Sequence, residues 1–193
     1  AWIDLSRAQL ERLDIPAAEA AIARAAALNP RSANVLVHVA NVEARAGRHA
    51  EAIETYRRAA TLSADSTHAF LGLGNTLKTI GRQAEAIDAY RQATAIRPGA
   101  SEAWWSLSNL KTFRFTDTEV EAIRQQLALP ALSGEARAQF SFALGKALED
   151  RGQYADAFEQ FATGNRLRRA LESYDPVQTE VVNERIRDVF DAD

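Results

Sequence analysis

Apolar residues recur along this chain at the three- and four-residue spacing of helices. In the segment 116–127, Val120, Ile123 and Leu127 share one helical face behind a capping box that Thr116 and Glu119 form. Val, Ile and Thr never cluster into alternating runs, and only five prolines and nine glycines interrupt the chain. The pattern therefore predicts an all-α fold.

The helical pattern repeats along the chain at a fixed period. Gly47 and Gly81 occupy the same place in consecutive copies, and the segment 49–57 returns as 83–91 with most residues kept. A further copy follows Gly152. The period of about 34 residues resembles that of the tetratricopeptide repeat family over nearly the whole chain. The resemblance implies a right-handed α-solenoid of helix-turn-helix units, which we place at about 1–32, 33–66, 67–100, 101–137 and 138–171.

The fourth unit and the two ends of the chain depart from the regular repeat. The fourth unit is degenerate, because its first helix, expected over 101–112, is followed by Thr112-Phe-Arg-Phe-Thr116 in place of a turn glycine. Asp175 and Pro176 predict the start of a last helix over about 175–190, which would cap the final unit or link it to a further domain. Because the chain begins at Ala1 and contains no Met, we expect it to be part of a longer polypeptide.

Small residues recur where the two helices of a unit must cross closely. They are Ser6, Ala40, Gly74, Ser108 and Gly145 in the first helices, and Ala18, Ala52, Ala86 and Ala157 in the second helices. Large residues fill the space beside them, namely Ile22, Tyr56, Tyr90 and Phe161. A unit of this kind cannot bury its apolar face alone, so the pattern predicts that neighbouring units stack.

Composition excludes several classes of protein. The 193 residues carry 23 basic and 26 acidic side chains, a net charge of −3, which gives little support for a nucleic-acid-binding surface. No apolar run reaches the length of a membrane span. The absence of cysteine removes disulfides, thiolate metal sites and cysteine nucleophiles, and it favours a cytoplasmic location.

We find no sequence motif for catalysis or for a cofactor. There is no phosphate-binding loop, no zinc-protease motif and no nucleophile elbow. His38 and His68 could approach each other across neighbouring units, but no acidic partner is evident that would complete a metal site. The sequence therefore predicts a chain that is not itself an enzyme and that has no cofactor.

Binding in a concave groove is the expected alternative to catalysis. In the repeat family this groove is lined by the first helices, and the resemblance places one recurring residue there: Asn41, Asn75 and Asn109, with Lys146 and Arg7 at the equivalent place of the outer units. Asparagine offers donors and an acceptor, so such a column could hold a peptide backbone, although each side chain could instead bond to its own helix. The other groove candidates are His38, Arg45, His68, Lys78, Trp105, Ser106, Thr112, Phe113 and Phe142. This mildly basic and aromatic surface suits a protein or peptide partner, and an acidic peptide in particular.

A more specific resemblance concerns residues 101–190. The segments 103–115, 142–152 and 164–169 are similar to the N-terminal repeat region of bacterial tetratricopeptide-sulfotransferase proteins. In that family a sulfotransferase domain that uses 3′-phosphoadenylyl sulfate comes after these segments. The resemblance implies that this chain is the non-catalytic part of such an enzyme, with no catalytic residue of its own.

The sequence leaves two functions open. The chain is either a module that recruits a partner or substrate peptide, or a scaffold that dimerises or packs on a catalytic domain while the groove is unused. In the second case Val181, Val182, Ile186 and Val189 of the last helix would dock onto the neighbouring body.

Overall fold

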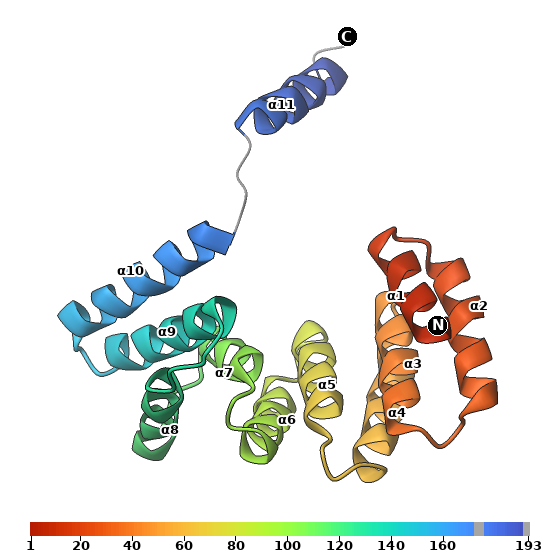
Figure 1. Cartoon of the computed structure of the whole chain (residues 1–193), viewed down its shortest axis with the longest axis horizontal. Helices are drawn as coiled ribbons and strands as arrows, with labels where there is room; N and C mark the ends of the chain where they lie inside the picture. Colours follow the sequence, from red (N-terminus) through yellow and green to blue (C-terminus); the bar gives the residue numbers. More distant parts are fainter. Residues whose placement is uncertain (172–175, 191–193) are drawn as a thin grey trace.

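The computed structural model describes residues 1–171 and 176–190, and no strand occurs in these two ranges. Figure 1 shows the helices following one another along an arc. In chain order they are α1 (Trp2–Glu11), α2 (Ile15–Leu28), α3 (Ala33–Arg45), α4 (His49–Thr61), α5 (Thr67–Thr79), α6 (Gln83–Ile96), α7 (Ser101–Ser108), α8 (Asp117–Leu127), α9 (Gly134–Glu149), α10 (Tyr154–Leu171) and α11 (Pro176–Phe190). The all-α prediction is confirmed.

Four helix pairs form the predicted hairpins. Helices α1 and α2, α3 and α4, α5 and α6, and α9 and α10 pack on each other, and α2 on α3 and α4 on α5 join successive pairs. The small residues of the second helices are buried in these contacts, with Ala18, Ala52 and Ala86 at 0% exposure and Ala157 at 3%. The chain is therefore an α-solenoid in which each pair completes the apolar core of its neighbour.

Glycine allows the first helix of a unit to contact the large residue of the second. A Cβ added at Gly74 would lie 2.5 Å from Cε1 of Tyr90, and one at Gly145 would lie 2.9 Å from Cδ1 of Phe161. Tyr90 itself is completely buried. The ring of each aromatic residue thus occupies the volume that a side chain at the small position would need.

The inter-helix turns share one backbone conformation. Gly47 and Gly81 both have a φ of +80°, and Gly152 has a φ of +73°. Leu13, one repeat period before Gly47, adopts the same left-handed conformation with a φ of +60° although it carries a side chain. An L-residue in this region costs roughly 1–2 kcal/mol of backbone energy, so Leu13 is a strained site.

Replacing Leu13 by glycine is expected to stabilise the chain by about 0.5–1 kcal/mol, because the relief of backbone strain exceeds the entropy that glycine adds to the unfolded state. Leu13 is 71% exposed, so little packing is lost. Urea-induced unfolding followed by circular dichroism measures the change. Leu129 is a matched control, because it is 47% exposed and Leu13 is the one non-glycine residue with a positive φ in the described ranges. Leu129→Gly should destabilise the chain, and equal effects of the two variants would show that Leu13 is unstrained.

The fourth unit departs from the repeat more than the sequence predicts. Helix α7 ends at Ser108 rather than at residue 112, and within residues 1–171 it packs on α9 and not along α8. Because no glycine turns the chain there, the segment after α7 runs inward. Phe113 and Phe115 are 5% and 8% exposed, and their rings meet edge to face with centroids 4.8 Å apart. The expectation that Phe113 lines the groove is therefore wrong, since its ring belongs to the core.

The predicted capping box at the start of α8 is present. The hydroxyl of Thr116 accepts a hydrogen bond of 3.2 Å from the backbone N–H of Glu119, and the Glu119 carboxylate accepts one of 2.8 Å from the backbone N–H of Thr116. These two bonds satisfy backbone donors that the helix leaves open at its first turn. Helix α8 therefore starts where the sequence predicts, although its neighbours differ.

Helix α11 does not pack along α10 in the described residues (Figure 1). Val181, Val182 and Ile186 are 40%, 52% and 51% exposed, so this apolar face has no covering surface within the described chain. The described residues thus do not form the expected cap over the last unit, whereas the alternative of a linking helix stays a prediction. Asp175 and the side chain of Val189, on which parts of that expectation depended, lie outside the described residues.

Candidate functional site

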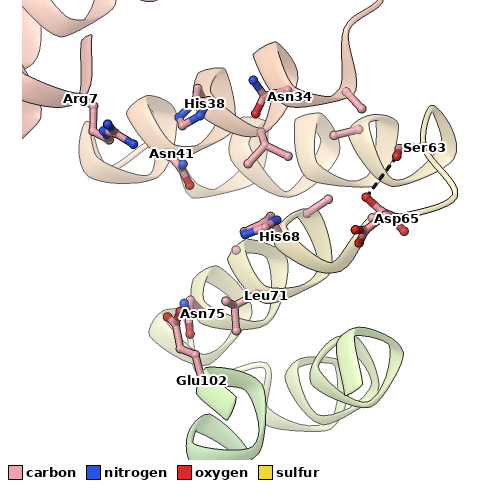
Figure 2. Close-up of a pocket in the computed structure, with 16 residues that line it drawn as sticks. Arg7, Asn34, His38, Asn41, Ser63, Asp65, His68, Leu71, Asn75 and Glu102 are labelled. Atoms are coloured by element: carbon pink, nitrogen blue, oxygen red, sulfur yellow. Dashed lines mark hydrogen bonds between the residues drawn. The ribbon is translucent and has the colours of Figure 1, made fainter. Parts of the chain in front are cut away.

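The first helices α1, α3 and α5 border two adjoining hollows on one side of the solenoid. Figure 2 shows the first hollow, which Glu102 of α7 also lines. The hollows have volumes of about 470 and 610 Å³. Both are lined by Arg7, Asn41, Gly72 and Asn75, so they form one groove across the first three units. We call this surface the groove from here on.

Asn41 and Asn75 are held in place by tyrosines of the second helices. The hydroxyl of Tyr90 donates a hydrogen bond of 2.8 Å to Oδ1 of Asn75, and the hydroxyl of Tyr56 donates one to Oδ1 of Asn41. Burial raises the pKa of Tyr90 to about 12, and burial also raises the pKa of Tyr56. Both phenols therefore stay protonated donors, and each asparagine keeps its amide N–H groups for another acceptor.

Asn109 does not continue this column. Its amide Nδ2 donates a hydrogen bond of 2.9 Å to the backbone carbonyl of Trp105, one turn earlier in the chain, because α7 has already ended at Ser108. The residue one repeat period after Tyr90 is Arg124, so the fourth unit has no tyrosine to hold an asparagine. The groove thus contains two tyrosine-held asparagines. The third, Asn109, instead bonds to the backbone of its own segment, which is the alternative role that we stated for these side chains.

Charged side chains lie along the same groove. Figure 2 shows Arg7, His38, His68 and Glu102 on four successive first helices. The pKa of His38 is lowered because burial disfavours the charged imidazolium, and the positive charge of Arg7 lowers it further. The pKa of Glu102 is raised because the groove wall partly desolvates its carboxyl group. Both groups would thus gain from a ligand charge of opposite sign.

Several of the predicted groove residues have other roles or places. Lys146 forms ion pairs with Asp150 and, at 3.3 Å, with Glu149 on its own helix. Phe142 packs on the backbone of Gly164, where an added Cβ would lie 2.8 Å from its ring. Lys78 and Trp105 are exposed but do not line the two hollows, whereas Arg45 lines the second. Ser106 is buried, and the hydroxyl of Thr112 donates a hydrogen bond of 3.1 Å to Gln83.

Glu102 is a charged groove residue that we did not predict from the sequence. It lies one repeat period after His68 and two periods after Asn34, and all three line the first hollow. The repeat register therefore contained the signal, since one position of each unit faces the groove. A search for one residue type that recurs at the same position does not find this groove position, because the side chain there differs between the units.

We find neither a metal-binding cluster nor a membrane-spanning helix among the described residues. No group of three or more His, Cys, Asp or Glu side chains in residues 1–171 and 176–190 is arranged to hold a metal ion. Across the same residues, we find no helix whose length and apolar character would let it cross a bilayer. The groove offers amide donors, charges of both signs and a partly apolar wall.

Comparison with known proteins finds a similar repeat family. A family model of the tetratricopeptide repeat matches residues 31–98, so this part of the α-solenoid is similar to that repeat. The matched range includes Asn41, Asn75 and the tyrosines that hold them. No curated protein sequence matches the chain.

Solved structures share the fold over nearly all of the chain. PilF from Pseudomonas aeruginosa is 18% identical, with 98% of this chain and 83% of that chain covered and a TM-score of 0.64. MamA from Desulfovibrio magneticus RS-1 is 18% identical, with 89% and 96% covered and a TM-score of 0.58. YrrB, described as a TPR protein with an unusual peptide-binding site, is 16% identical, with 86% and 84% covered and a TM-score of 0.56. At these identities the similarity shows the fold alone.

Proposed function

We propose that this chain is a protein-interaction module that binds an extended peptide segment of a partner or substrate in the groove. The observation that carries the proposal is the pair of tyrosine-held asparagines, Asn41 and Asn75, on neighbouring first helices. Their free amide N–H groups lie one unit apart and can donate to backbone carbonyls of a peptide regardless of its side chains. The peptide-binding site of the similarly folded YrrB supports this type of ligand.

The cationic side of the groove favours acidic side chains in that peptide. Arg7 and His38 line the first hollow, and the pair that Arg7 forms with Asp4 is long, at 3.6 Å, and exposed. An exposed pair of this kind contributes little, so Arg7 can exchange it for a carboxylate of the ligand at low cost. Charge-assisted hydrogen bonds to such a carboxylate would add to the backbone contacts of the asparagines.

The proposal is tested with a twelve-residue peptide selected on the chain from a random phage-displayed library. We expect Asn41→Ala combined with Asn75→Ala to weaken the binding of this peptide by at least about tenfold, because each lost hydrogen bond is worth roughly 1 kcal/mol. Fluorescence anisotropy of the labelled peptide measures the affinity. A second variant, with Asp at both positions, keeps the acceptors for Tyr56 and Tyr90 but removes the amide donors, and it should lose affinity similarly.

Asn109→Ala is the matched control, since Asn109 is the same residue type but is bonded to its own helix. Its affinity should stay within about twofold of the wild type. If both double variants bound the peptide as well as the wild type, the groove would be unused. The scaffold function through the exposed apolar face of α11 would then replace the proposal.

We further propose that the module belongs to a sulfotransferase polypeptide. The support is the resemblance of residues 101–190 to the repeat region of bacterial tetratricopeptide-sulfotransferase proteins, and the groove would then present the substrate peptide to that enzyme. The coding sequence downstream of Asp193 tests this point. A strand followed by a phosphate-binding loop for 3′-phosphoadenylyl sulfate would support it, and a downstream sequence without such a domain would overturn it.

A further inference from the structure

The two ends of the first hollow carry opposite charges. Arg7 of α1 and His38 of α3 lie at one end, and Glu102 of α7 lies at the other, beside Asn75 (Figure 2). Glu102 has no hydrogen bond or ion pair among the described residues, and the charged groups that act on its carboxyl are His68 and Glu135. Its charge is therefore available to a ligand.

The other charged residues of the groove leave this asymmetry in place. Asp65 also lines the first hollow, but it pairs with Arg97 and bonds to Thr67, so its charge is already balanced. Glu11 and Arg45 line the second hollow and contribute one charge of each sign there. The groove thus has its unbalanced cation at Arg7 of α1 and its unbalanced carboxylate at Glu102 of α7.

We propose that the groove binds its peptide in one direction, with an acidic side chain at Arg7 and His38 and a basic side chain at Glu102. This inference rests on the proposed function and specifies its ligand. Asn41 and Asn75 lie between the two charged ends and donate to backbone carbonyls, which are present in either direction of the chain. Direction therefore depends on the charges, because a reversed peptide would place like charges together at both ends.

The separation of the charged ends sets the spacing of the two ligand side chains. From α1 to α7 the peptide crosses three steps between first helices, and for each step we take about 8–10 Å, the usual spacing of neighbouring helices. An extended peptide advances about 3.3 Å per residue, so roughly seven to nine residues separate the acidic from the basic side chain. A twelve-residue peptide is long enough to span both ends.

The opposing charges also disfavour a peptide whose charged side chains all have the same sign. A uniformly acidic peptide would gain at Arg7 but would be repelled by the carboxylate of Glu102, which forms no ion pair within the described residues. A uniformly basic peptide would be repelled in the same way by the guanidinium of Arg7. A peptide with both charges at the correct distance pairs both groups.

Parallel selections from the same twelve-residue phage library test the inference. One uses the wild-type chain, and the other uses a chain in which the charges are exchanged, Arg7→Glu with Glu102→Arg. Wild-type selections should be enriched in peptides with acidic and basic residues about eight positions apart in one order, and the exchanged chain should select the opposite order. Each chain should bind its own selected peptide about tenfold more tightly than the other chain does, and high salt should reduce the difference.

A matched control exchanges two exposed charges of the second helices, Arg24→Glu with Glu51→Arg, neither of which lines the groove. This variant should select the same order as the wild type. Selected peptides that depend on Asn41 and Asn75 but show no charge order, or the same order on both chains, would overturn the inference and leave the proposed function intact. Selection of no peptide, or only of peptides that ignore Asn41 and Asn75, would overturn both.

Discussion

Replacing Gly74 by valine is expected to lower the free energy of unfolding of this chain by about 3 kcal/mol. A Cβ at this position would lie 2.5 and 2.7 Å from Cε1 and Cδ1 of Tyr90, a residue at 0% exposure. The ring of Tyr90 has no free space to move into, because it is part of the main core cluster, which extends from the second unit to the fifth. The branched side chain therefore forces α5 away from α6. The contacts of this unit with the units on either side are weakened as well, because neighbouring units complete one another's core.

The repeat itself supplies a graded comparison for this variant. Ala40 occupies the equivalent position of the second unit and is completely buried beside Tyr56. Gly74→Ala should therefore cost much less than Gly74→Val, because a single methyl group is already accommodated at this position elsewhere in the solenoid. Urea unfolding measured by circular dichroism ranks the two variants.

Gly134→Val is the matched control for the added side chain. Gly134 is also helical, but the nearest atom to an added Cβ, Cδ2 of Leu171, is 3.9 Å away. This variant should change stability by less than about 0.5 kcal/mol. The cost of Gly74→Val should fall in the presence of Tyr90→Leu, since contacting residues do not act additively. If valine cost the same at residues 74 and 134, the close approach of Gly74 and Tyr90 would be wrong.

The parts of the fold that could be predicted are those that every unit needs. Each unit must cross two helices at a small residue and must turn between them, so Ala52 and Ala86, and Gly47 and Gly81, recur in the sequence for a direct physical reason. The turn conformation explains Leu13 as well, because the same backbone geometry is required there despite the change of residue. Such constraints are local, and they repeat along the chain.

The parts of the candidate site that could not be predicted depend on single units. Asn109 matches Asn41 and Asn75 in register, yet it bonds to Trp105 because α7 ends early and no tyrosine follows. Lys146 occupies the groove position of its unit, but Asp150 lies one turn later on the same helix and pairs with it. In both cases the side chain bonds to a partner on its own segment. The position of a residue within the repeat does not predict such a partner.

Replacing Phe115 by alanine is expected to destabilise the chain by about 3–5 kcal/mol, because the deletion would leave a cavity among aromatic rings. The ring of Phe115 meets Phe113 edge to face, and its centroid is 6.2 Å from that of Trp104. Trp104 is itself 4% exposed, and its indole N–H donates a hydrogen bond of 2.8 Å to the carbonyl of Pro98. The loop after α7 therefore fills the space that a normal second helix would fill.

Phe158→Ala tests whether this cost belongs to the site or merely to the loss of a phenylalanine. Phe158 is 73% exposed on α10, so the same substitution there should change the free energy of unfolding by less than about 0.5 kcal/mol. Thermal and urea unfolding of both variants give the comparison. If Phe115→Ala lowered the free energy of unfolding as little as Phe158→Ala, the segment would be a surface loop, and other residues would have to form the core of the fourth unit. A large difference means that Phe113, a groove candidate in the sequence, and its neighbour Phe115 replace the helix hairpin as the link between the third and fifth units.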